Sequence, residues 1–184
     1  EKSEIRSLLS IQENKKFIYI GSIYPRRKIE IFLDSFVWYF QVYPNDTITL
    51  LWWDDDEYII NLKKKYTQKN IIFLGSVDQD KVQSYLLDSD YGVAYIPMSS
   101  YFMDQPPLKT IEYLWAWLPV IGTRTNGNEL FVKKINGILT EDSIENFEKG
   151  ILEFRKKFED YIPSEISKSI EEYEWKNIYS SIEN

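Results

Sequence analysis

Two carboxylates and a lysine lie close together around one predicted helix start. Asp104 precedes Glu112 by eight residues, and Lys109 lies between them. Pro106 opens the predicted helix, because proline is tolerated where the first N–H groups lack internal partners. From there to Glu112 is roughly 9 Å along the helix axis, too far for the two carboxylates to share a proton. They could hold two ends of one long ligand, with the positive helix N-terminus between them for a phosphate.

The same two carboxylates have an ordinary alternative explanation. Asp104 would cap the helix and Glu112 would be solvated, and spacing alone favours this because such caps are common. A ligand-binding role therefore needs a second signal elsewhere in the chain.

A basic loop follows the first predicted strand. It begins with Gly21 and Ser22 and ends with the cations Arg26, Arg27 and Lys28. Three cations at the end of a strand can hold a diphosphate through charge-assisted, partly bidentate contacts. Cations at a helix N-terminus oppose the helix dipole, so the run is locally unfavourable and suggests a ligand, although a solvated loop is the alternative. The GxGxxG pattern of a dinucleotide site is absent here.

The composition excludes several functional classes. The formal net charge of −7 argues against nucleic acid or an anionic membrane as the main partner. The chain has no histidine and no cysteine, so the usual neutral-pH base, disulfides and cysteine metal sites are excluded. The acidic run Asp54 to Glu57 could invite a metal, but four consecutive acids cannot all face one ion, and a capped, solvated helix start is favoured. No apolar run is long enough to span a membrane and no signal peptide is visible.

Predicted strands and helices alternate along the chain. The strand candidates are apolar runs of the buried parallel type, at residues 16–21, 46–53, 70–75, 91–96, 118–122 and 137–139. Helical patterns cover about 29–40, 57–66, 78–87 with Asp78 as its cap, 106–117, 129–134, 143–159 and 163–182. The apolar face of helix 106–117 is predicted to comprise Leu108, Ile111, Trp115 and Leu118. This alternation predicts one α/β domain, a Rossmann-like doubly wound parallel sheet of about six strands, with ligands at the carboxyl ends of the strands.

The stretch after Asp104 resembles the donor-binding signature of the glycosyl transferases group 1, the retaining GT-B glycosyltransferases of family 4. In that family an acidic residue, seven further residues and a Glu precede YLAAGLPVI. Here Asp104-x7-Glu112 precedes residues 113–121. Asp104 departs from the family, which usually has Glu, and Trp115 and Trp117 stand where small residues are usual.

Other segments carry the same resemblance, in the family's order. The basic loop is similar to GRxxxxKG, in which Arg27 falls on the Lys that contacts the donor diphosphate. Ser22 stands where the family has Arg, so that contact is either lost or supplied by Arg26 or Lys28. Residues 74–77 match FLGxV, where family members receive the nucleotide base. Three further segments match short family motifs: 86–90 matches YLLxSD, 126–129 matches GGNRE and 136–139 matches NGxL. Residues 105–109 resemble a variant of the donor-binding signature found in members that act on surface polysaccharides. Residues 174–179 resemble the helix that crosses to the other domain of GT-B enzymes.

The resemblance implies that residues 1–184 are a single donor-binding domain, one half of a GT-B fold, with C-terminal helices at about 143–183. The implied substrate is a UDP- or GDP-sugar, bound by Gly21, Ser22, Arg26, Arg27, Lys28, Gly75, Ser76, Val77, Gln105, Leu108, Lys109 and Glu112. The implied catalytic residues are Asp104, Arg27 and Lys109. No cofactor and no metal are expected, since GT-B enzymes usually need none.

Two functions stay open on this basis. The first is a transferase domain that passes a glycosyl group, with retention, to a glycan or lipid-linked saccharide in polysaccharide biosynthesis. The second is a non-catalytic nucleotide-sugar-binding subunit or regulatory module that needs a partner chain. The chain starts at Glu1 and lacks the acceptor-binding N-terminal domain of a GT-B enzyme, so we expect a fragment that is inactive alone. The expected location is cytoplasmic, with peripheral association at the inner membrane face through the other domain as an open alternative.

Overall fold

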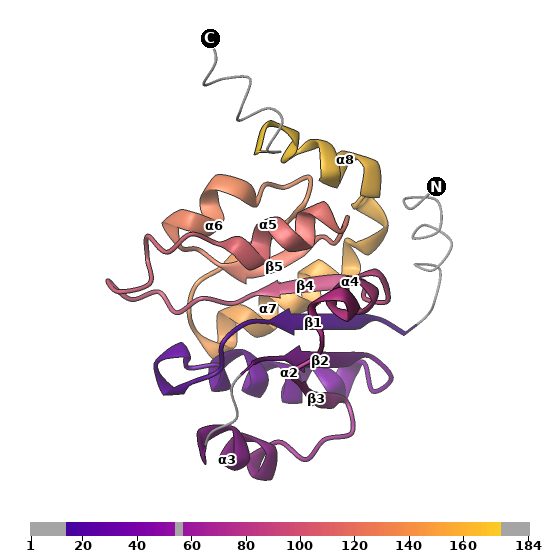
Figure 1. Cartoon of the computed structure of the whole chain (residues 1–184). Helices are drawn as coiled ribbons and strands as arrows, with labels where there is room; N and C mark the ends of the chain where they lie inside the picture. Colours follow the sequence, from indigo (N-terminus) through magenta and orange to yellow (C-terminus); the bar gives the residue numbers. More distant parts are fainter. Residues whose placement is uncertain (1–13, 54–56, 174–184) are drawn as a thin grey trace.

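The computed structural model describes residues 14–53 and 57–173 and contains one parallel sheet. Its strands lie in the order β3-β2-β1-β4-β5-β6, and every neighbouring pair is parallel (Figure 1). The strands are β1 (Lys16–Ile20), β2 (Thr47–Leu51), β3 (Ile71–Gly75), β4 (Tyr91–Ala94), β5 (Val120–Thr123) and β6 (Gly137–Thr140). The predicted Rossmann-like fold with six parallel strands is therefore confirmed.

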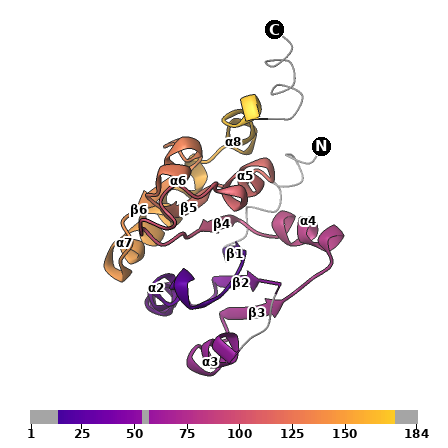
Figure 2. The same ribbon diagram turned by 60° about the vertical axis from the view of Figure 1, so that its left-hand side comes forward.

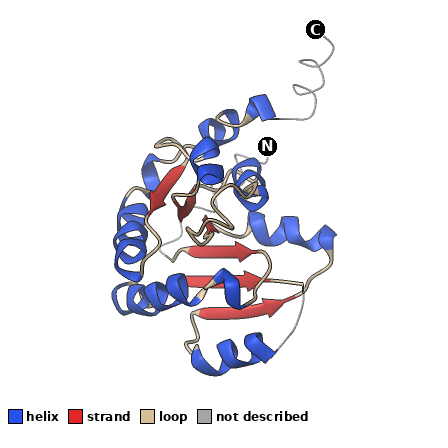
Figure 3. Ribbon diagram, turned by 90° about the vertical axis from the view of Figure 1, so that its left-hand side faces the viewer, coloured by secondary structure: helices blue, strands red, loops and turns tan. Residues whose placement is uncertain are grey.

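Helices cover both faces of the sheet (Figures 2 and 3). They are η1 (Pro25–Arg27), α2 (Glu30–Val42), α3 (Glu57–Lys65), α4 (Gln79–Leu87), α5 (Leu108–Trp115), α6 (Asn126–Phe131), α7 (Ile144–Lys156), η2 (Phe158–Asp160), α8 (Pro163–Lys168) and η3 (Glu171–Tyr173). Helices α2 and α7 pack against each other on one face, whereas α4 and α5 lie on the other. The chain crosses from β3 over the sheet to β4, so the strand order reverses between β1 and β4.

An aromatic cluster joins the two central strands to the α2 and α7 face. The ring of Phe17 on β1 stacks on that of Tyr91 on β4, with centroids 4.6 Å apart, and meets Phe36 of α2 edge-on. Phe154 of α7 also packs against the Tyr91 ring, with the two centroids 4.6 Å apart. All four side chains are fully buried, which explains why the central strands read as unbroken apolar runs.

The orientation of α5 differs from the prediction. Its buried residues are Thr110, Tyr113 and Leu114, whereas Leu108 is 67% exposed and Trp115 is 41% exposed. The predicted apolar face is therefore only partly right: Leu118 is fully buried and Ile111 packs against the core, whereas Leu108 and Trp115 are exposed. Tyr113 turns inward because its hydroxyl accepts a hydrogen bond from the Ile20 N–H at 2.8 Å, so a polar atom satisfies the backbone at the end of β1.

The bounds of two helices and one strand also differ from the prediction. Helix α5 starts at Leu108 instead of Pro106, and it ends where Trp117 takes the left-handed conformation (φ 59°). The following strand starts at Val120, two residues later than predicted. Helix α6 begins three residues before the predicted Glu129, because the Thr125 side chain accepts a hydrogen bond from the Asn128 N–H and so caps the helix earlier.

One predicted helix cap makes a different contact, and other predicted features fall partly outside the described residues. Asp78 precedes α4 as predicted, but its carboxylate pairs with Lys81 at 2.7 Å instead of bonding the helix backbone. The predicted helix 163–182 is wrong in its length, because α8 ends at Lys168 and the separate turn η3 follows at Glu171–Tyr173. Residues 54–56 and 174–184 are outside the described ranges. Within those ranges no helix is long and apolar enough to cross a membrane.

Candidate functional site

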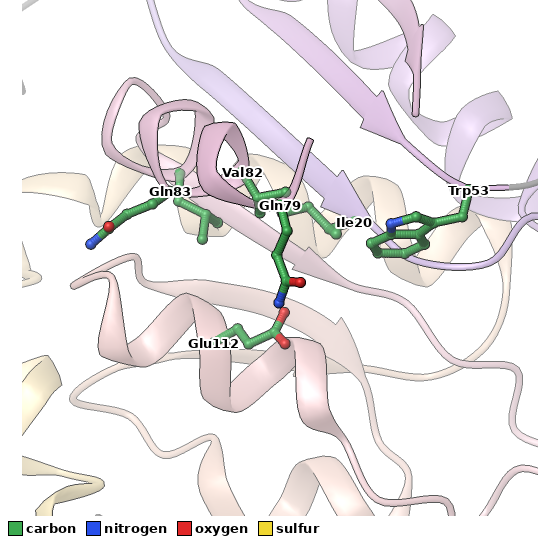
Figure 4. A pocket seen from close by; sticks show the side chains of 7 residues that line it. Ile20, Trp53, Gln79, Val82, Gln83 and Glu112 are labelled. Atoms are coloured by element: carbon green, nitrogen blue, oxygen red, sulfur yellow. The ribbon is translucent and has the colours of Figure 1, made fainter. Parts of the chain in front are cut away.

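Two adjoining pockets lie near the point where the strand order reverses, beside the carboxyl end of β1. One, of about 230 Å³, lies between the loop after β1 and the start of α5. The other, of about 390 Å³, lies between that strand end and α4 (Figure 4). Ile20, Trp53 and Glu112 line both pockets. Ligands of doubly wound sheets bind at such a crevice, so we treat the two pockets as one candidate site with two ends.

Lys109 lies in the first turn of α5 and lines the smaller pocket. Its Nζ atom is buried and has no hydrogen-bond partner, and it lies 4.2 Å from the centroid of the Tyr19 ring. Burial away from water, helped by the nearby positive charge of Arg27, lowers the pKa of Lys109 to about 7, although Glu112 opposes the shift. A buried amine without a hydrogen-bond partner is unfavourable, and an anionic ligand would relieve it.

Gly21 allows Lys109 to lie this close to the backbone. A Cβ atom at position 21 would lie 2.9 Å from Lys109 Nζ, and the backbone there has φ 153°, which L side chains rarely adopt. A glycine at the end of β1 therefore makes room for the amine beside the main chain.

Arg27 is the second buried cation of the smaller pocket. It is 8% exposed; its guanidinium donates a hydrogen bond to Gln105 Oε1 at 2.9 Å and lies 4.6 Å from the centroid of the Phe102 ring. Its Nε atom is buried without a hydrogen-bond partner. The contacts with Gln105 and Phe102 tie η1 to the loop between β4 and α5, so the two loops that line the pocket are joined.

Glu112 lies one turn after the start of α5, where the two pockets meet. Figure 4 shows its carboxylate pointing toward the side-chain amide of Gln79 on α4. Partial burial raises the pKa of Glu112, while the charge of Lys109 opposes that shift. The carboxylate thus faces a groove that carries two cations at one end and an apolar and amide-lined pocket at the other.

Asp104 lies in the loop before α5, and neither pocket is lined by it. Its Oδ1 atom accepts a hydrogen bond from Asn126 Nδ2 at 2.7 Å, and its side chain is exposed. The N-cap of α5 is Pro107, without a side-chain hydrogen bond, so the alternative in which Asp104 caps this helix is wrong. The contact with Asn126 instead links the loop to the first turn of α6.

Asn128 fixes the position of α5 from the other side. Its side-chain amide donates to the carbonyls of Ala94 and Thr123, at 3.0 and 2.8 Å, and accepts from the Thr110 hydroxyl at 2.7 Å. It is fully buried. One amide therefore connects the ends of β4 and β5 to the helix that carries Lys109 and Glu112. Because a buried amide must be bonded, this network specifies one arrangement of the helix.

The predicted site residues fall into two groups. The smaller pocket is lined by Gly21, Ser22, Arg27, Gln105, Leu108, Lys109 and Glu112. The others line neither pocket: Arg26 and Lys28 are exposed on η1 and just after it, Gly75 ends β3, and Ser76 and Val77 lie in the loop that follows. Val77 packs against the hydrophobic core.

Sequence reasoning missed most of the larger pocket. Its lining comprises Ile20, Trp53, Gln79, Val82, Gln83, Leu86 and Glu112, of which only Glu112 was predicted. The one available signal was the pair Trp52-Trp53 at the end of a strand, since two large aromatic side chains there cannot both enter the core. The glutamines of α4 carry no comparable signal, because glutamine is ordinary on an exposed helix face.

No group of three or more acidic side chains that could hold a metal ion occurs within residues 14–53 and 57–173. The charged groups that line the two pockets are the cations Arg27 and Lys109 and the carboxylate of Glu112.

Most of the chain matches a known protein family. The family model described as "Glycosyl transferases group 1" matches residues 14–156. The comparison with curated proteins gave no match.

Several solved structures share the fold at low sequence identity. Anabaena Alr3699/HepE, in complex with UDP and glucose, superposes with a TM-score of 0.75 at 17% identity over 98% of this chain and 50% of that one. The pneumococcal O-GlcNAc transferase GtfA, in complex with UDP and GlcNAc, gives 0.73 at 16% identity, over 95% and 36%. TarM gives 0.72 at 18% identity, over 92% and 34%. The chain thus spans a third to a half of the length of these structures, whose fold it shares, and by its family match it belongs to the glycosyl transferases group 1.

Proposed function

We propose that this chain is the donor-binding domain of a retaining glycosyltransferase of family 4, and that it binds a UDP-sugar. The observation that carries the proposal is the buried, unpartnered Lys109 Nζ at the carboxyl end of β1, beside Arg27 and one turn from Glu112. Two buried basic side chains close to a carboxylate fit a diphosphate followed by a ribose. The presence of UDP in the structures of Alr3699/HepE and GtfA supports uridine as the nucleoside.

These residues bind different parts of the ligand. Lys109 and Arg27 hold the diphosphate, and Glu112 accepts hydrogen bonds from the ribose hydroxyls at the junction of the pockets. When the glycosyl group leaves, the two cations and the N-terminus of α5 stabilise the departing diphosphate, so the reaction needs no bound metal. Asp104 lies in the loop just before α5 and would orient the sugar by bonding one of its hydroxyls, directly or through a water.

The whole protein would transfer the sugar to a glycan or lipid-linked saccharide in polysaccharide biosynthesis. An acceptor domain outside this chain would complete the active site, so the isolated domain would bind donor without turning it over. We place that protein in the cytoplasm, peripheral to the inner membrane face, because an acceptor of this kind is membrane-linked. A non-catalytic binding subunit that works with a partner chain would use the same donor site.

Calorimetric titration with UDP tests the donor site through Glu112→Gln. The change keeps the shape of the side chain but removes the charge that strengthens its hydrogen bonds, so UDP affinity should fall by about 1–3 kcal/mol. Glu145→Gln is the matched control: this exposed glutamate lies in the first turn of α7, on the opposite face of the sheet, and its loss should leave affinity unchanged.

Two results would count against the proposal. Equal UDP affinity of Glu112→Gln and wild type would remove Glu112 from the site. Wild-type protein that binds none of UDP, GDP and ADP would overturn the donor-binding function itself.

A further inference from the structure

Trp53 is a large, solvent-exposed aromatic side chain just after the end of β2. It is 54% exposed, whereas the adjacent Trp52 is 2% exposed and packs near Phe73 and Lys63. Within the described residues the Trp53 ring meets no other aromatic ring and no cation. An exposed indole offers a large flat apolar surface that a ligand can cover, and this one lines both pockets of the candidate site.

The order of the groups in a nucleotide decides which part of it would reach Trp53. The ribose of a nucleoside diphosphate lies between the phosphates and the base. With the phosphates at Lys109 and Arg27 and the ribose at Glu112, the base continues into the larger pocket, on the far side of Glu112. This step rests on the proposed donor-binding function.

The larger pocket has the chemistry of a base site. Ile20 and Leu86 are buried and Val82 is half-buried, so they give it an apolar floor. Figure 4 shows the Trp53 indole at one end of the pocket, across from the side chains of α4. Besides Glu112, its polar lining consists of the amides of Gln79 and Gln83, which can both donate and accept hydrogen bonds. A flat, uncharged group with donors and acceptors on its edge suits this lining.

We propose that the Trp53 indole stacks on the base of the bound nucleotide and that the amide of Gln79 faces the polar edge of that base. Stacking on an indole stabilises any bound base, because every base offers a π face. Trp53 therefore contributes affinity for the nucleoside part of the ligand, whichever base it carries. The Gln79 amide, which points toward Glu112, sits where ribose and base meet and favours one base over another. Base recognition here comes from side chains of β2 and α4 and does not depend on the predicted loop at 75–77.

Binding of UDP and of inorganic pyrophosphate to three variants tests the proposal. Trp53→Ala should weaken UDP binding by about tenfold or more, as alanine substitution of a stacking residue does, and Trp53→Phe should recover part of that loss. Pyrophosphate, which has no base, should bind both variants as it binds wild type. Trp115→Ala is the control, because this second exposed tryptophan, on α5, lines neither pocket.

Fluorescence gives a second readout. UDP should quench part of the tryptophan emission of wild type, and Trp53→Phe should abolish that quench while calorimetry still detects UDP. Unchanged UDP affinity in Trp53→Ala would overturn the proposal, as would an equal loss of UDP and pyrophosphate binding, which would indicate a general disturbance of the site. Failure of the proposed function looks different: wild type would then bind no nucleoside diphosphate.

For Gln79, the test is discrimination between bases. Gln79→Ala should reduce the ratio of UDP to ADP affinity by several-fold while pyrophosphate binding is unchanged. Gln41→Ala, at an exposed glutamine of α2 that lines neither pocket, is the control and should leave the ratio unchanged. An unchanged UDP to ADP ratio in Gln79→Ala would remove that residue from base recognition.

Discussion

At the scale of single residues, Lys109 is the most informative side chain of the site. Its amine is buried without a hydrogen-bond partner and faces the Tyr19 ring of β1, Arg27 of η1 and Glu112 of its own helix. Burial raises the pKa of the Tyr19 phenol, so Tyr19 stays neutral near pH 7 and cannot pair with the amine. Lys109 therefore costs stability in the empty protein and recovers that cost with an anion.

We predict that diphosphate binding takes up protons through Lys109. The pKa of about 7 in the empty site leaves the amine mostly neutral above pH 7, and a bound diphosphate raises that pKa by favouring the charged form. UDP affinity should accordingly fall by about tenfold between pH 7 and 8.5, the range over which the empty site loses its proton and the bound site keeps it. Calorimetry in Tris and in HEPES at pH 8 measures the uptake, because the two buffers have different ionisation enthalpies.

The control for this prediction is a pair of lysine variants. Lys109→Met should bind UDP more weakly and lose the proton uptake, whereas Lys149→Met, exposed on α7, should behave as wild type. Identical heats in the two buffers for the wild-type protein would show that Lys109 is already charged in the empty site.

At the scale of elements, the site depends on how α5 is held against the sheet. Two close approaches restrict it. A Cβ atom at Gly92 of β4 would lie 2.4 Å from the Tyr113 ring, and one at Gly127 of α6 would lie 2.5 Å from the Gln105 carbonyl. Together with the hydrogen bonds of Asn128, these contacts fix α5 and the loop before it, so Lys109 and Arg27 meet at a defined place.

We predict that Asn128→Ala destabilises the fold by about 2 kcal/mol or more. The change leaves the carbonyls of Ala94 and Thr123 and the hydroxyl of Thr110 buried without their amide partner, and each unsatisfied group costs about 1–3 kcal/mol. Urea unfolding at equilibrium measures the free energy. Asn126→Ala, two residues earlier and exposed, should cost under about 1 kcal/mol, since it removes a single exposed contact with Asp104. Similar losses in both variants would mean that the buried network is unimportant.

At the scale of the whole molecule, the chain shares its Rossmann-like fold with part of proteins two to three times as long. The two pockets of the candidate site lie beside the carboxyl end of β1, near the point where the strand order reverses. Asp104 lines neither pocket, so the role that we propose for it is tested where a donor and an acceptor are both present.

We predict that Asp104→Asn lowers kcat at least tenfold in a glycosyltransferase that carries this domain together with its acceptor domain. A carboxylate that orients the sugar acts mainly in the transition state, so turnover should fall while UDP affinity stays normal. Steady-state kinetics and UDP titration on the same variant separate the two effects. Asp160→Asn, an exposed residue of η2, is the control. Full turnover by Asp104→Asn would limit Asp104 to its structural contact with Asn126.

Much of the fold could be read from the sequence because the relevant signals are local. Buried parallel strands give unbroken apolar runs such as Lys16 to Ile20, and the helices between them predict the parallel sheet. The spacing of Asp104, Lys109 and Glu112 likewise follows from a single stretch of chain. Errors arose where a local pattern competes with a distant contact: α5 reads as amphipathic through Leu108 and Trp115, yet the backbone of β1, over ninety residues away, turns Tyr113 inward.

The tertiary structure alone decided which side chains meet. Arg27 and Gln105 lie 78 residues apart in the sequence, and their hydrogen bond joins two loops that only the strand order brings together. Whether Trp53 or Trp52 faces the core, and whether the amine of Lys109 is buried or solvated, depends on neighbours contributed by other strands and helices. Residue type and spacing therefore determined the sheet and the signature, whereas burial and charge at the site were set by long-range packing, because desolvation depends on what surrounds a group in space.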